Sequence, residues 1–277
     1  MEFDLDNPLI AGEDDRTGSI AGLFSAENDH MSSFAGSDSS VSRQNVVSLL
    51  IQMRFACNLD PFLIYLAASY IDRFLSKRKI PSEKPWMVRL LCVSCLSLAA
   101  KMKKINLSIA DLQGEDGFIF DSRTIKRMEL LVLGALEWRM RSITPFAFVK
   151  FFIEFFIPDR PPLVKALRNR AIETIFQAQN EIKTLEFKPS EISASALLSA
   201  ANELFPVQFP AFRSAIASSE FVNEEKLMEC FDLMSDLVAM DGSDSCNTPV
   251  TVLAPFCSIS SAGLGSDDRK RRAHNWD

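Results

Sequence analysis

The sequence is poor in the residues that most enzymes use for acid–base chemistry. It has two histidines, His30 and His274, and both fall in terminal segments that we expect to lie outside the folded part. Histidine is the commonest general base and metal ligand near neutral pH. The sequence also lacks a glycine-rich phosphate loop and a nucleophile elbow. These absences predict a non-catalytic protein.

Secretion signals and long uncharged apolar runs are absent as well. The acidic N-terminus has neither the basic start nor the apolar core of a signal peptide. No uncharged apolar run approaches the roughly 18 residues that a membrane span needs. We therefore expect an intracellular protein that does not bind a membrane.

Cysteine is scarce and scattered. Cys92 and Cys95 have the C-x-x-C spacing, but no second pair of ligands is suitably placed for a zinc site. We interpret the two residues as reduced core thiols one helical turn apart, and we expect neither a metal nor a cofactor. The remaining cysteines lie in apolar or tail sequence: Cys57, Cys230, Cys246 and Cys257.

Composition divides the chain into a folded centre and two flexible ends. Residues 1–40 carry nine acidic residues and one basic residue, without a sustained apolar period, and predict a disordered leader. In residues 41–241 apolar positions recur at helical spacing, and 25 basic residues nearly balance 23 acidic ones. Residues 242–277 turn to Ser, Gly and Pro and predict a flexible tail.

Two segments of the centre repeat one design. Residues 84–101 and 188–204 each begin with Lys-Pro and continue as a helix of Ala, Ser, Leu and Cys or Ile. Their separation exceeds the roughly 20–50 residues of a solenoid repeat. A helix that is apolar on all sides must be surrounded by other helices. The pattern predicts an all-α fold of two stacked subdomains, each built around one central helix.

Lys101 ends the first of these apolar helices. A cation near a helix C-terminus is stabilised by about 0.3–1 kcal/mol through the unpaired carbonyls. Lys101 can equally donate to the helix end or loop of a partner, with Leu98 and Met102 beside it for apolar contact. The residues alone leave both interpretations open.

The segment "TIKRMELLVLGALEW" predicts an amphipathic helix. Its apolar stripe is formed by Ile125, Met128, Leu131, Val132 and Leu136. Glu129 lies off the centre of this stripe, where an ordinary surface acid can pair with Lys126.

Four segments together resemble the plant D-type cyclins: "YLAASYIDRFL", "KPWMVRLLCVSCLSLAAKM", "RTIKRMELLVLGALEWRMRSITPFAFVKFF" and "LEFKPSEISASALLSAANEL". The resemblance implies two tandem cyclin boxes, residues 41–142 and 143–241, each with five helices around a central one. It further implies a non-catalytic subunit that binds and activates a cyclin-dependent kinase at the G1-to-S transition of the plant cell cycle.

The resemblance also assigns residues to a kinase interface. Lys101 and Glu129 match the lysine and glutamate through which cyclins hydrogen-bond the kinase. Four residues match apolar positions of the same interface: Leu98, Met102, Trp138 and Met140.

The sequence departs from the cyclin pattern at three functional positions. Lys103 and Lys104 stand where cyclins commonly have two acids, which implies an altered kinase preference. In the Met-Arg…Trp pattern of the substrate-docking groove, Arg43 is kept while Ser42 and Leu49 replace the Met and the Trp. The Leu-x-Cys-x-Glu motif is missing, as in the sixth D subgroup. A retinoblastoma-like protein is thus an expected partner through the kinase complex only.

The tail contains a four-residue basic run, Arg269, Lys270, Arg271 and Arg272. Such a run is a candidate nuclear import signal or a solvated charged tail. We expect a location in the nucleus and also in the cytoplasm.

Two other functions stay open as alternatives. A transcription factor with the same two-box fold, like transcription factor IIB, would predict an N-terminal zinc ribbon and a clearly basic folded face. Residues 1–40 contain no cysteine and the folded part is nearly neutral, so we expect no nucleic-acid partner. The second alternative is a helical adaptor that binds no kinase.

Overall fold

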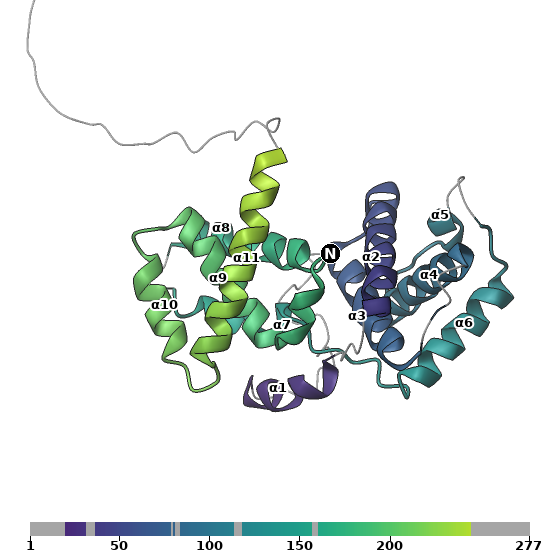
Figure 1. Ribbon diagram of the computed structural model, residues 1–277, viewed down its shortest axis with the longest axis horizontal. Helices are drawn as coiled ribbons and strands as arrows, with labels where there is room; N and C mark the ends of the chain where they lie inside the picture. The colour runs from purple at the N-terminus through teal and green to yellow at the C-terminus, as the bar shows by residue number, and fades with distance from the viewer. Residues whose placement is uncertain are drawn as a thin grey trace, which may run out of the picture.

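The computed structural model describes residues 20–31, 37–78, 80, 84–113, 118–156 and 160–244. Within these residues the chain forms helices, turns and loops without a strand. The helices gather into two boxes that lie side by side, one around α4 and the other around α9 (Figure 1). The predicted all-α fold of two tandem helical units is confirmed.

The first box surrounds one apolar helix. Its helices are α2 (Ser37–Cys57), α3 (Pro61–Lys77), α4 (Pro85–Met102), α5 (Ile109–Gln113) and α6 (Ser122–Ala135). α4 contacts the other four, and each residue from Leu90 to Ala100 is buried. α3 begins where the Asp60 carboxylate accepts a hydrogen bond from the Phe62 amide at 2.8 Å, and α6 begins likewise at Asp121.

The second box repeats this arrangement. Its helices are α7 (Phe146–Ile153), α8 (Pro161–Ala178), α9 (Pro189–Leu204), α10 (Phe209–Ala217) and α11 (Glu224–Asp244), with a short 3-10 helix, η2 (Ile182–Glu186). α9 contacts α7, α8, α10 and α11, and each residue from Pro189 to Ala201 is buried. Its alanines and serines let the neighbouring helices approach closely. Both small-residue helices that the sequence singled out are therefore central.

The acidic leader contains a folded element that composition did not indicate. Residues 20–30 form α1 (Ile20–Ala26) and the 3-10 helix η1 (Glu27–His30), against the second box (Figure 1). Phe24 stacks on Phe221 with ring centroids 4.4 Å apart. The buried Glu27 carboxylate accepts hydrogen bonds from the Ser190 amide at 3.0 Å and hydroxyl at 2.9 Å, at the start of α9.

The expectation of a disordered leader over residues 1–40 thus fails for residues 20–30, and also for residues 37–40, where α2 begins. Residues 242–244 of the predicted tail likewise belong to α11. Composition predicts that the acidic side chains of the leader are exposed to solvent. The Glu27 carboxylate is instead buried, where it accepts a hydrogen bond from the backbone amide of Ser190 at the start of α9. Residues 1–19 and 32–36 lie outside the described residues, as do residues 245–277 of the predicted tail.

α4 is long and apolar enough to cross a membrane by length and composition, and no other helix in the described part of the chain is. Of this helix, 61% is buried inside the protein. Its apolar surface is covered by the rest of the first box, as expected for a core helix.

Candidate functional site

Lys101 and Glu129 meet where the C-terminal end of α4 lies against α6. The Lys101 ammonium lies 2.6 Å from both carboxylate oxygens of Glu129. The side chain of Glu129 is 8% exposed, whereas that of Lys101 is 60% exposed. A buried carboxylate is thus held beneath a solvent-facing ammonium.

This geometry corrects the interpretation of Glu129 as a surface acid paired with Lys126. Spacing along α6 placed Glu129 off the apolar stripe, but α4 covers that side of α6. The partner comes from 28 residues upstream. No pattern local to α6 contains that information.

The pair keeps unused hydrogen-bonding capacity. An ammonium has three donors, and a carboxylate has about four acceptor sites. A partner backbone that reaches this point can accept from the exposed Lys101 ammonium. It would also exclude water from an ion pair that is already half-buried, which strengthens the electrostatic attraction.

The four apolar residues that the resemblance assigned divide into two exposed and two buried side chains. Met102 is 41% and Trp138 67% exposed, so both are available to a partner. Leu98 and Met140 belong to the core of the first box. The Tyr70 hydroxyl donates to the Met140 carbonyl at 2.9 Å and fixes the backbone there. Leu98 and Met140 therefore support the surface from below.

Trp138 is held outward by an unusual backbone. Glu137 and Trp138 have φ values of 54° and 61°, in the left-handed region that bulky residues rarely adopt. The Trp138 amide donates to the Leu133 carbonyl at 2.9 Å, and Lys77 pairs with the Glu137 carboxylate at 2.8 Å. These contacts maintain the strained turn after α6. Consecutive strained residues beside an exposed indole are typical of a functional surface.

Two further exposed leucines extend the apolar surface along α6. Leu130 is 52% and Leu131 50% exposed. The apolar stripe predicted from the sequence included Leu131, but this side chain is half exposed. The buried side of α6 is formed by five other residues: Ile125, Met128, Glu129, Val132 and Ala135. Four consecutive apolar residues, 130–133, could have indicated that some of them face outward.

The two lysines that replace the acidic pair have different surroundings. Lys103 is half-buried, and this burial lowers the pKa of its ammonium, although Asp60 opposes the shift. Lys104 is exposed and has a φ of 56°, just beyond the end of α4. Lys104 is consequently the more accessible of the two to a partner.

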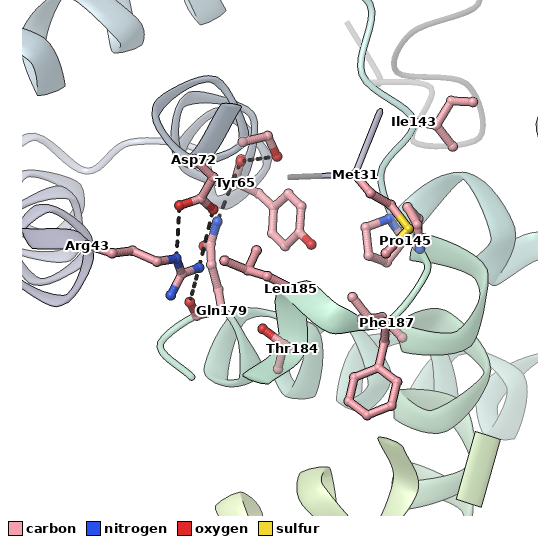
Figure 2. Close-up of a pocket in the computed structure, with 13 residues that line it drawn as sticks. Met31, Arg43, Tyr65, Asp72, Ile143, Pro145, Gln179, Thr184, Leu185 and Phe187 are labelled. Atoms are coloured by element: carbon pink, nitrogen blue, oxygen red, sulfur yellow. Dashed lines mark hydrogen bonds and ion pairs between the residues drawn. The ribbon is translucent and has the colours of Figure 1, made fainter. Parts of the chain in front are cut away.

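Arg43 lies in the interior, which corrects its assignment to a substrate-docking groove. Its Nε and Nη2 donate to the two carboxylate oxygens of Asp72 at 2.9 and 3.3 Å, and Nη2 also donates to the Gln179 carbonyl at 2.9 Å (Figure 2). Arg43 is 1% exposed and cannot contact a docked peptide. Leu49 is half-buried against the first-box core. Arg43 instead joins α2 and α3 to the segment after α8.

A small cavity lies beside this ion pair, where the two boxes meet (Figure 2). Its volume is about 70 Å³, enough for a few water molecules. Polar and apolar side chains from both boxes line it: Tyr65, Asp72, Gln179, Thr184, Leu185 and Phe187. Its size suits a hydrated junction rather than a substrate site.

The cysteine pair is buried, as the sequence indicated. Cys92 and Cys95 are free thiols inside the first-box core, and burial raises the pKa of Cys92 to about 12. Within the described ranges, no three His, Cys, Asp or Glu side chains gather in a way that could hold a metal ion. His274 and the basic run Arg269–Arg272 lie outside those ranges.

Comparisons with known proteins agree with the two-box architecture. The family model described as "Cyclin, N-terminal domain" matches residues 23–141, and "Cyclin, C-terminal domain" matches residues 143–250. The solved structure of a viral cyclin from herpesvirus saimiri superposes with a TM-score of 0.66 at 16% identity, covering 79% of this chain and 96% of that one. This likeness shows the fold.

Two curated relatives are plant proteins of one D subgroup. Cyclin-D6-1 of Oryza sativa subsp. japonica is 40% identical over 291 residues, which cover 98% of this chain and 90% of the relative. A D6 cyclin of Arabidopsis thaliana is 40% identical over 273 residues, 91% of this chain and 90% of the relative. The resemblance drawn from the four sequence segments is confirmed: the chain belongs to the plant D-type cyclins, a family of regulatory proteins of the cell cycle.

Proposed function

We propose that this chain binds and activates a cyclin-dependent kinase and so controls the G1-to-S transition and cell division in plants. The Lys101–Glu129 pair is the centre of the interface, and the exposed side chains of Met102 and Trp138 flank it. The observation that carries the proposal is the buried Glu129 carboxylate beneath the exposed Lys101 ammonium, 2.6 Å apart. Family membership supports the class of partner.

The chain acts without catalysis of its own in this proposal. It repositions the regulatory helix and the activation segment of the kinase, which then carries out phosphoryl transfer. A retinoblastoma-like protein reaches the complex as a substrate of the kinase. Neither a nucleic acid nor a membrane takes part.

The physical basis is the desolvation of charge at the interface centre. An exposed ion pair contributes about 0–1 kcal/mol. Charged residues in a desolvated interface centre can contribute several times more, because each lost hydrogen bond leaves a buried group unpaired. Lys101 is part of an exposed ion pair in the free protein, and it becomes a desolvated charge at the interface centre when a partner covers it.

Co-purification with a plant cell-cycle kinase, followed by a phosphorylation assay on histone or a retinoblastoma-like protein, tests the proposal. Lys101→Glu should abolish kinase recovery while the helical circular dichroism signal stays. Lys165→Glu, at an exposed lysine of α8, is the matched control for the charge change. Equal kinase recovery by both variants would sink the site assignment.

We also propose a nuclear location, with cytoplasmic protein as well, directed by Arg269, Lys270, Arg271 and Arg272. The support is the composition of this run alone. Deletion of residues 269–272 from a fluorescent fusion should lower the nuclear fraction. An unchanged distribution discards the import role.

A further inference from the structure

The outward side of α6 carries cations and leucines that no other part of the described chain covers. We name five exposed residues the α6 outer face: Arg123, Lys126, Arg127, Leu130 and Leu131. They recur at three- and four-residue steps, so they share one side of the helix. Lys126 and Arg127 each precede a leucine by four residues, which places basic and apolar groups in adjacent turns.

The cations of this face are not arranged to stabilise α6. Arg123, Lys126 and Arg127 occupy its first two turns, where the helix dipole disfavours positive charge, and no acidic residue lies in the first turn. Among the described residues, no carboxylate forms an ion pair with any of the three. The Asp121 carboxylate nearby accepts a hydrogen bond from the Thr124 amide as the helix cap. The charges of Arg127 and Arg123 contribute to lowering the pKa of Asp121, after its hydrogen bonds from Thr124, but they form no close ion pair with it. Basic groups without an ion-pair partner, beside half-exposed leucines, are suited to an acidic partner.

The partner that fits must be acidic and carry large apolar side chains in a short length. The chain itself contains such a segment outside the described residues. Residues 2–6 read Glu-Phe-Asp-Leu-Asp, which is three carboxylates interleaved with Phe3 and Leu5. Residues 1–19 as a whole have six carboxylates and one arginine. Charge and apolar content both complement the α6 outer face.

The covalent connection is long enough for this contact. Thirteen residues lie between Asp6 and Ile20, where α1 begins against the second box. An extended chain of that length spans about 45 Å. A domain of about 100 residues has a radius of gyration of about 13 Å, so the linker can reach across one box. Tethering also raises the local concentration of the segment to about the millimolar range, which makes a weak contact effective.

We propose that the acidic segment Glu2–Asp6 docks on the α6 outer face of the same chain. Leu130 directly follows Glu129, so the docked segment covers part of the surface assigned to the kinase. The leader and the kinase then compete for the first box. This competition rests on the proposed function, whereas the docking itself does not.

Zero-length carbodiimide crosslinking of the full chain tests the docking, because it joins a carboxylate to an amine only at direct contact. Peptide mass spectrometry should find leader carboxylates joined to Lys126 about tenfold more often than to Lys165, an exposed lysine of α8. The preference should vanish near 1 M ionic strength, where the screening length is about 3 Å. Equal coupling to both lysines overturns the proposal, as do links that form only between two chains.

Two variants separate the electrostatic contribution of the α6 arginines from the apolar contribution of the leader. Lys126 is unchanged in both, so its crosslink to the leader can be measured in each. Arg123→Glu/Arg127→Glu should lower the Lys126 crosslink about tenfold, with Arg160→Glu/Lys165→Glu in the second box as the control of equal charge change. Phe3→Ser/Leu5→Ser should lower it while keeping every carboxylate. A Lys126 crosslink that survives both variants contradicts docking.

The kinase measurement distinguishes this inference from the proposed function. Neutralising the leader with Glu2→Gln, Asp4→Asn and Asp6→Asn should raise kinase affinity about threefold or more, against Glu13→Gln, Asp14→Asn and Asp15→Asn as the matched control. Lys126 crosslinks without any kinase recovery would overturn the proposed function and leave the docking. Kinase affinity that is equal in all leader variants would overturn the competition.

Discussion

The Lys101 ammonium contacts both carboxylate oxygens of Glu129 at 2.6 Å, and the two residues divide burial unequally. Glu129 belongs to the interior of the first box and Lys101 to its surface. The electrostatic attraction within the pair therefore becomes stronger, without any movement of the two side chains, when a partner removes the water above Lys101. Substitutions on either side should separate its effect on folding from its effect on binding.

Glu129→Gln should weaken kinase binding at least about tenfold, because charge-assisted hydrogen bonds are roughly twice as strong as neutral ones. The amide keeps the size of the carboxylate, so the free energy of unfolding should fall by only about 1–2 kcal/mol. Kinase titration and urea denaturation measure the two effects. Glu203→Gln, at an exposed acid of the second box that pairs with Arg170, is the control. Kinase affinity unchanged in Glu129→Gln would contradict the central role of the pair.

Trp138→Ala should mainly lower kinase affinity and Met140→Ala should mainly lower the free energy of unfolding, although the resemblance assigned both positions to one interface. The exposed indole contributes little to folding, so its loss should lower kinase affinity at nearly constant stability. Removing the buried Met140 side chain should lower the free energy of unfolding by about 2–5 kcal/mol. Chemical denaturation of each variant, beside kinase titration, makes the comparison. A large stability loss in Trp138→Ala would remove the distinction.

The sequence predicted the parts of the fold that depend on local pattern. Proline after an N-cap marked the start of α3, and apolar residues on every side marked α4 and α9 as central. The sequence did not predict the burial of charged side chains whose contacts come from residues distant in the chain. α4 buries Glu129, α3 buries Arg43, and the start of α9 buries Glu27, and each of these partners is distant in sequence.

Arg43→Met should lower the free energy of unfolding by about 3–5 kcal/mol, because it leaves the buried Asp72 carboxylate without its partner. The double variant Arg43→Met/Asp72→Leu should regain much of this loss, since a matched apolar pair needs no charge compensation. A double-mutant cycle in urea quantifies the coupling. Strictly additive losses would show that the ion pair is not the source of the effect.

The attachment of α1 and η1 should weaken as pH rises above about 4.5, the usual pKa of a glutamate. Burial raises the pKa of Glu27, against hydrogen bonds from Ser190 and the charge of Lys188. The folded state therefore binds the proton more tightly than the unfolded state. The stabilisation is complete below the ordinary pKa and is lost as pH rises through the raised one.

Hydrogen exchange of residues 20–30, corrected for intrinsic rates, measures this dependence. Glu27→Gln keeps an oxygen acceptor for the Ser190 amide and removes the charge, so its protection should vary less with pH. Asp29→Asn, at an exposed acid of η1, serves as the control. Identical pH profiles for Glu27→Gln and the unmodified chain would exclude Glu27 as the titrating group.

Lys103→Glu/Lys104→Glu should change which kinase binds most tightly across a panel of plant cell-cycle kinases. Most of the effect should come from the exposed Lys104, because Lys103 is half-buried beside α4. Restored acids would favour kinases whose surface is basic at this point, and rates of association should show the effect most at low salt. Single variants assign the contribution of each lysine. The same order of affinities for all variants would rule out a role in specificity.

The apolar surface of α4 affects how the newly synthesised chain folds and how much of it escapes degradation. Before α2, α3, α5 and α6 pack around it, the segment Pro85–Met102 exposes its apolar side chains to solvent. Chains with such exposed apolar surface aggregate readily and are bound by chaperones or degraded by proteases. Small losses of first-box stability then change cellular abundance several-fold, even when the substituted residue is far from any partner. The cellular amount of this cyclin should therefore depend on how stably the first box encloses this one helix.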